Sequence, residues 1–134
     1  MNSKAILVVD DEPAILDMIA ELLAYEGYQV VTTSHGSVAL AWAKADPPAL
    51  ILLDLMMPGI SGWQMIAALK ASPQTRAIPI VVLSARRDLP AIAKELGIMT
   101  FLAKPFDIDE LIGIVRHYAD SSSSSGVSSP AAES

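Results

Sequence analysis

Residues 49–59 have the sequence Ala-Leu-Ile-Leu-Leu-Asp-Leu-Met-Met-Pro-Gly, in which an unbroken apolar run stops at Asp54. Successive apolar residues, unlike alternating ones, are typical of a strand that is buried on both faces. Such strands occur in parallel sheets with helices on both sides. The stretch therefore predicts a central strand over Ala49–Leu53 and places a carboxylate where that strand ends.

Strands and helices are predicted to alternate along the rest of the chain. Four further short apolar segments predict strands over Ala5–Val9, Gln29–Thr32, Ile80–Leu83 and Ile98–Leu102. Helical periodicity predicts helices over Pro13–Tyr25, Ser37–Ala45, Gly62–Ala71, Leu89–Leu96 and Ile108–Tyr118. Repeated strand–helix units predict an α/β fold, a doubly wound sheet of five parallel strands with five helices.

The length and composition of the chain fit one domain followed by a short tail. Of its 134 residues, 52% are hydrophobic and 18% are charged, which argues against disorder over most of the chain. Residues 121–134 are rich in serine and contain a single sizeable apolar residue, Val127, too little to offset the entropy of ordering. We expect a folded domain over residues 1–120 and a flexible Ser-rich tail over residues 121–134.

Charge and cysteine content exclude several classes of function. The chain has no cysteine, which excludes a disulfide framework, thiolate catalysis and cysteine-ligated metal sites. A net charge of −6 leaves no basic stripe for direct binding of nucleic acid. No apolar run reaches the roughly 18 residues of a membrane span, and the N-terminus does not resemble a signal peptide. We expect a soluble, cytoplasmic protein without membrane insertion, whose partners are proteins.

Polar residues follow four of the predicted strands, at the sheet edge where open parallel α/β folds bind ligands. These residues are Asp10, Asp11, Glu12, Asp54, Ser84 and Lys104. Carboxylates brought together repel, and two unit charges at roughly 4 Å cost on the order of 4 kcal/mol at an effective dielectric of ~20. A hard divalent cation removes this cost, and an all-oxygen site is the preference of Mg²⁺.

The same set of residues suits a phosphoryl group bound beside Asp54. Lys104 supplies positive charge, Ser84 supplies a hydroxyl donor, and Asp54 is a carboxylate nucleophile. Taken singly, each has an ordinary explanation: an aspartate caps a helix, Ser84 is a surface or capping hydroxyl, and Lys104 belongs to a charged turn. Their conjunction at four strand ends favours a functional site.

Four short motifs occur in a fixed order along the chain. They are Asp10-Asp11, Asp54 with Met57-Pro58-Gly59 and Gly62-Trp63, Ser84-Ala85, and Lys104-Pro105-Phe106. Together they resemble the motifs of receiver domains of two-component response regulators, of the single-domain chemotaxis-regulator type, over about residues 4–119. The resemblance implies a flavodoxin-like fold with strand order 2-1-3-4-5. It also implies that the first and fifth helices share one face of the sheet.

The resemblance further implies a metal site. It makes Asp54 the phosphoacceptor and assigns Mg²⁺ to Asp11 and Asp54 as direct ligands. The backbone carbonyl of Met56 would complete the protein ligands, and Asp10 would act mainly through water.

Other roles carried over from the family concern the phosphoryl group and the response to it. Ser84 would hydrogen-bond the phosphoryl group, and Lys104 would bind one of its oxygens. The peptide bond between Lys104 and Pro105 is expected to be cis. Phe101 occupies the place of the family's switching aromatic residue, although a phenylalanine at that point of a buried strand is also ordinary core.

The function implied by the resemblance is that of a phosphorylatable signalling switch. A histidine kinase or phosphotransfer protein would transfer a phosphoryl group to Asp54 with Mg²⁺, and the affinity for an output protein would change. Such a protein is not an enzyme for other substrates, because it catalyses only its own phosphorylation and slow dephosphorylation.

Two alternatives remain open at this stage. A pseudo-receiver would keep the fold as an interaction module without phosphorylation. The presence of all five motif residues argues against it; they are Asp10, Asp11, Asp54, Ser84 and Lys104. A phosphohydrolase with an aspartyl nucleophile usually needs a second acid two positions later, where this chain has Met56.

The span from Ser84 to Lys104 is a couple of residues shorter than the family's pattern. That shortening argues against the usual dimerisation mode and leaves a phosphorylation-dependent dimer open.

Overall fold

Five parallel strands form one sheet in the computed structural model, which describes residues 5–55, 62–85, 94 and 100–120. The strands are β1 (Ile6–Val9), β2 (Val30–Thr33), β3 (Leu50–Asp54), β4 (Ile80–Ser84) and β5 (Thr100–Ala103). Their order is β2-β1-β3-β4-β5, and each neighbouring pair is parallel. The fold class and strand order expected from the sequence are confirmed, and the strand bounds differ by one or two residues.

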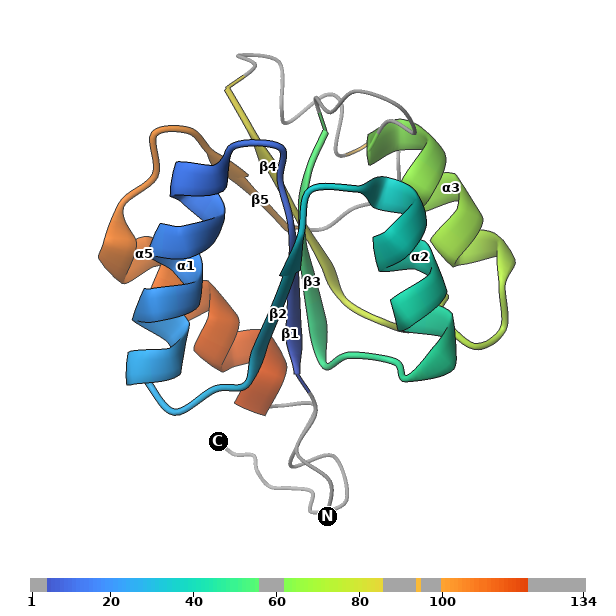
Figure 1. The fold of residues 1–134 in the computed structure, drawn as a ribbon, viewed down its shortest axis with the longest axis horizontal. Coiled ribbons are helices and arrows are strands. Elements are labelled where there is room, and N and C mark those ends of the chain that lie inside the picture. Colours follow the sequence, from blue (N-terminus) through green and yellow to red (C-terminus); the bar gives the residue numbers. More distant parts are fainter. Residues whose placement is uncertain (1–4, 56–61, 86–93, 95–99, 121–134) are drawn as a thin grey trace.

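Helices cover both faces of this sheet. Within the described residues they are α1 (Pro13–Tyr25), α2 (Gly36–Ala45), α3 (Gly62–Ala71) and α5 (Ile108–Val115). Figure 1 shows α1 and α5 on one side of the sheet and α2 and α3 on the other. The predicted helix over Leu89–Leu96 falls outside the described residues except for helical Lys94. The proposed tail over residues 121–134 also lies outside them.

The core consists of two layers, one on each face of the sheet, because successive strand residues point to opposite faces. Ile6 and Val8 of β1 pack with buried residues of α1 and α5. Leu7 and Val9 pack with buried residues of α2 and α3. The strands β1, β3 and β4 are buried along their whole length, as their continuous apolar sequences predict.

The last helix ends earlier than the sequence predicts. The apolar periodicity predicts a helix over Ile108–Tyr118, whereas the α-helix ends at Val115 and the chain continues as a π-helical turn over Arg116–Asp120. The π-helical turn makes two long-range side-chain bonds, from Tyr118 to Thr100 of β5 and from Arg116 to Glu26 after α1. Periodicity cannot report such contacts.

Candidate functional site

The strand register brings the predicted polar residues to one edge of the sheet. Val9 of β1 pairs with Leu53 of β3, so the next residues in the two strands, Asp10 and Asp54, lie side by side. Asp54 pairs with Leu83, the residue before Ser84. Ser84 in turn pairs with Ala103, the residue before Lys104. The polar residues predicted at four strand ends therefore form one row across the carboxyl edge of the sheet.

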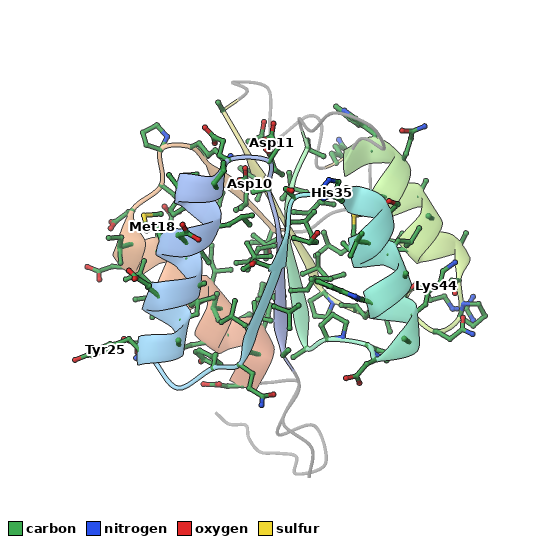
Figure 2. All side chains as sticks on the ribbon, in the orientation of Figure 1. Asp10, Asp11, Met18, Tyr25, His35 and Lys44 are labelled. Atoms are coloured by element: carbon green, nitrogen blue, oxygen red, sulfur yellow. The ribbon has the colours of Figure 1, made fainter. Side chains whose placement is uncertain are left out.

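Three carboxylates converge in this row. Asp10, Asp11 and Asp54 each offer an oxygen, and these oxygens all lie within 4.8 Å of one another. Asp10 and Asp54 are buried, whereas Asp11 is exposed. Figure 2 shows Asp10 and Asp11 where β1 meets the start of α1, at the end of the molecule opposite to Tyr25. Two members of the cluster are therefore buried at the edge of the core, and the third is open to solvent.

Lys104 neutralises part of this charge. Its Nζ donates to Asp10 Oδ2 at 2.7 Å and to Glu12 Oε1 at 3.0 Å, and it lies 3.5 Å from Asp54 Oδ2. Burial of the ammonium lowers its pKa, but the hydrogen bonds to Asp10 and Glu12 and the neighbouring charges raise it more, so the pKa of Lys104 lies above its usual value. Lys104 is therefore a fixed positive charge beside Asp54.

Asp10 is held by hydrogen bonds on both of its oxygens. The backbone N–H of Glu12 donates to Asp10 Oδ1 at 2.9 Å, and Lys104 donates to Oδ2. An ionised carboxylate has about four lone-pair sites, so these two bonds fix the orientation of Asp10 and leave its oxygens able to face a metal ion. The mainly water-mediated role expected for Asp10 stays a prediction.

Backbone pairing at the carboxyl end of the sheet holds Ser84 and Lys104 in place. Ser84 is fully buried at the last position of β4. Its backbone carbonyl accepts a hydrogen bond from the Lys104 backbone N–H at 2.9 Å. The peptide bond between Lys104 and Pro105 is cis, as expected.

Phe101 lies on β5, opposite Val82 of β4. It is partly buried and packs against the core layer beneath α2 and α3. This position connects it to the core on the α3 side of the sheet. Met56, the other residue that the sequence assigns to the metal site, lies outside the described residues.

Two residues of the site were given no role from the sequence. Glu12 accepts a hydrogen bond from Lys104, whereas the sequence places it among the polar residues after the first strand without assigning it a function. Gly62 begins α3 directly against the backbone of the central strand: a Cβ there would lie 2.5 Å from Leu55 Cα and 2.8 Å from the Asp54 carbonyl oxygen. Its N–H also donates to the Leu55 carbonyl at 3.2 Å. The glycine in a helical first turn is the one sequence signal that pointed to such a close approach.

The donor set fits a magnesium ion. The three clustered side chains offer carboxylate oxygens alone, which are the ligands preferred by hard divalent cations. Asp11 is exposed, so an ion has a route from solvent. Within the described part of the chain, Lys104 is the cation bonded to this cluster, and it carries one charge against three.

Comparison with known proteins identifies the family of this site. The family model described as the response regulator receiver domain matches residues 6–116. The chain belongs to the response regulator receiver family. Receiver domains are signalling modules of two-component systems and interact with histidine kinases or phosphotransfer proteins. No helix among the described residues has the length and apolarity required to cross a membrane.

Curated relatives differ in how much of their length the chain covers. The chain is 36% identical over 118 residues to sporulation initiation phosphotransferase F of Bacillus subtilis, and this match covers 88% of the chain and 94% of that protein. It is 42% identical over 116 residues to response regulator PleD of Caulobacter vibrioides, covering 85% of the chain but only 26% of PleD. The similarity to PleD therefore concerns one part of a longer protein.

One of the similar solved structures contains a metal ion. The receiver domain of a sensor histidine kinase from Pseudomonas aeruginosa PAO1 has a TM-score of 0.79 with this chain at 28% identity. The match covers 89% of the chain and 99% of that domain. Its structure contains a magnesium ion coordinated in the active-site cleft.

Proposed function

We propose that this receiver domain accepts a phosphoryl group on Asp54 from the phosphohistidine of a histidine kinase or phosphotransfer protein. The observation that supports this proposal most strongly is the placement of Asp54. It is buried at the end of the central strand, with two other carboxylates within 4.8 Å and Lys104 at 3.5 Å. A nucleophile of this kind needs positive charge on the group that it attacks, and the site gathers that charge around it.

In the proposed reaction, a carboxylate oxygen of Asp54 attacks the phosphorus atom as the phosphorus–nitrogen bond of the donor histidine breaks. Lys104 donates hydrogen bonds to the phosphoryl oxygens from its position between Asp10 and Asp54. The Ser84 hydroxyl donates to the phosphoryl group after transfer. Mg²⁺, held by Asp11 and Asp54 with the Met56 carbonyl, would neutralise negative charge on the phosphoryl oxygens when bound.

Asp10 and Glu12 have a supporting role in this proposal. They hold Lys104 by hydrogen bonds of 2.7 and 3.0 Å, so the ammonium stays at the site before a donor arrives. Positioning a charge in advance lowers the cost of reorganisation during the reaction. Phosphorylation is then expected to change the affinity of the domain for an output protein through Ser84 and Phe101.

The test of this proposal uses acetyl phosphate as the donor and the intact mass of the protein as the readout. We expect the parent chain to gain one phosphoryl group in the presence of Mg²⁺ and none in the presence of EDTA. Asp54→Asn should gain none, and Asp17→Asn, which changes an exposed carboxylate on α1, should behave as the parent does. Absence of labelling in the parent would favour the pseudo-receiver function instead.

A further inference from the structure

An apolar pocket lies at the opposite end of the sheet from the aspartate cluster. It has a volume of about 300 Å³, and the residues that line it include Ala5, Leu7, Val31, Trp42, Asp46 and Pro48. Ala5 precedes the first residue of β1, whereas Asp10 follows its last residue. The C-terminal half of α2, near Lys44 in Figure 2, forms one wall of the pocket. The pocket therefore belongs to a different surface from the phosphorylation site.

Large apolar side chains are exposed at the rim of this pocket. Trp42 is 42% exposed and Val31 is 38% exposed, and Val38 lies one helical turn before Trp42 with 36% exposed. Exposed apolar groups gathered around a cavity mark interaction sites more often than scattered ones do. Tryptophan contributes particularly strongly to binding when it is covered by a partner.

The pocket borders an edge strand whose backbone faces outward. β2 pairs with β1 alone among the described strands. The Gln29 and Thr33 carbonyls accept hydrogen bonds from β1 and the residue after it, so the intervening residues Val30 and Thr32 turn their backbone groups away from β1. The strand sequence Val-Val-Thr-Thr contains no lysine or proline, the residues that commonly protect such edges.

We propose that the β2 edge and this pocket together bind an extended segment of a partner protein by strand addition. The backbone of the segment would pair with Val30 and Thr32, and the side chain placed beside Val31 would enter the pocket next to Trp42. Alternate side chains of an added strand point to one face, which places that side chain on the α2 side. The pocket volume suits one large apolar side chain and lies at the lower limit of about 300 Å³ for small-molecule sites.

Charge favours a basic segment over a second copy of this chain. Asp46 is the ionisable residue among those that line the pocket. Lys44 in the last turn of α2 carries one opposing charge, but the chain as a whole carries a net charge of −6. Lysine or arginine beside the apolar anchor would therefore be attracted, whereas two copies of this acidic chain would repel each other. This binding does not depend on the proposed phosphorylation of Asp54.

The test is an NMR titration of the ¹⁵N-labelled chain with the peptide acetyl-Lys-Val-Lys-Leu-Lys-Val-Lys-amide. We expect saturable shifts at the Val30 and Thr32 amides and at the Trp42 indole N–H. A peptide of the same composition in the order Lys-Lys-Lys-Lys-Val-Leu-Val controls for charge alone, because it lacks the alternation that strand addition needs. It should bind at least about tenfold more weakly.

Two variants separate the backbone contribution from the pocket contribution. Thr32→Pro removes an outward N–H without removing a bond to β1, and edge strands tolerate proline. Trp42→Ala removes the exposed rim of the pocket. We expect each to weaken binding by about tenfold, whereas Tyr25→Ala, which removes an 89%-exposed aromatic residue on α1, should leave it unchanged.

Several results would overturn the proposal. These are shifts confined to Asp10–Glu12, equal binding of the two peptides, unchanged affinity in Trp42→Ala, or no saturable binding up to about 1 mM peptide. Shifts of the same β2 residues with protein concentration alone would assign this edge to a second copy of the chain, and would also overturn it.

Discussion

At the scale of single residues, the site balances three carboxylates against one ammonium. Asp10 and Asp54 are buried although ionised groups are rarely buried without a partner, and Lys104 contacts both. The remaining negative charge is what a divalent cation would neutralise. We therefore predict that the acidic residues favour metal binding. We also predict that their repulsion lowers the free energy of unfolding of the metal-free protein.

Asp11→Ala tests this balance. Removing one of three like charges relieves repulsion, so the free energy of unfolding without Mg²⁺ should rise by about 1 kcal/mol, a modest value because Asp11 is exposed to solvent. Mg²⁺ binding measured by calorimetric titration should be lost, since Asp11 is an expected direct ligand. Unchanged Mg²⁺ affinity in this variant would show that the metal ligands are assigned incorrectly.

Gly62→Ala tests how closely α3 must approach the central strand. A Cβ at this position would lie 2.5 Å from Leu55 Cα, so the helix or strand must move. We expect the free energy of unfolding to fall by about 1–3 kcal/mol and phosphorylation of the adjacent Asp54 to slow by about tenfold.

Gly113→Ala is the matched control for Gly62→Ala. Gly113 lies in α5, and a Cβ there would meet nothing within 4 Å. The same substitution should therefore stabilise the protein by up to about 1 kcal/mol through helix propensity and leave phosphorylation unchanged. If Gly62→Ala and Gly113→Ala had the same effects on stability and on phosphorylation, the close approach of α3 to the central strand would not matter for either.

The polar residues of the site were predictable because of where strands end. Asp10, Asp54, Ser84 and Lys104 each follow an apolar run, and parallel register brings such positions together. The hydrogen bond from Lys104 to Glu12 and the packing of Gly62 on Leu55 were not predictable in the same way. They depend on distances between segments far apart in the chain, which a sequence pattern does not contain.

At the scale of elements, β4 and β5 connect the proposed phosphorylation site to Phe101. Ser84 ends β4 beside Asp54, and Phe101 pairs with Val82 two residues earlier in the same strand. We predict that Ser84→Ala still accepts a phosphoryl group but that the chemical-shift response of Phe101 to beryllofluoride falls to less than about half. Equal chemical-shift responses in the variant and the parent would show that Ser84 does not take part in the switch.

Tyr28 connects the end of α1 to the π-helical turn, and its titration gives a pH test. Its hydroxyl donates to Asp120 Oδ1 at 3.1 Å, and burial, followed by this hydrogen bond and the Asp120 charge, raises the pKa of Tyr28 above 10.0. A raised pKa in the folded state stabilises the fold below pH 10.0, and this contribution is lost as the pH rises through the raised value.

Tyr28→Phe should therefore be less stable than the parent below pH 10.0, by about 0.5 kcal/mol. The two free energies of unfolding should converge as the pH rises further, as measured by urea unfolding across this range. Tyr25→Phe, at an 89%-exposed tyrosine, is the control and should follow the parent. Parallel curves for Tyr28→Phe and the parent would exclude a role for the Tyr28 hydroxyl.

Elements with local boundary signals were predicted most accurately. The bounds of α1 are those expected, because Pro13 occupies the first turn and Gly27 follows with a φ of 97°. The end of α5 was predicted less accurately, because its apolar spacing continues into the π-helical turn. In that turn Arg116 and Tyr118 bond Glu26, which follows α1, and Thr100 of β5, contacts that a sequence pattern does not contain.

At the scale of the whole molecule, the sheet separates two surfaces with different chemistry. The carboxyl ends of the strands carry the aspartate cluster, and the amino ends carry the apolar pocket beside β2. The first surface was predictable from the sequence because its residues follow strands. The pocket was not, because its walls come from Ala5, Trp42 and Pro48, which have no common sequence pattern.

The most direct test of the proposed function is to locate the phosphoryl group on the chain. The protein is treated with acetyl phosphate and Mg²⁺ and then with sodium borohydride, which reduces an aspartyl phosphate to homoserine. Peptide sequencing by mass spectrometry then identifies the modified residue. We predict homoserine at position 54 and nowhere else. Homoserine at position 10 or 11, or unmodified aspartate at all three positions, would show that Asp54 is not the phosphoacceptor.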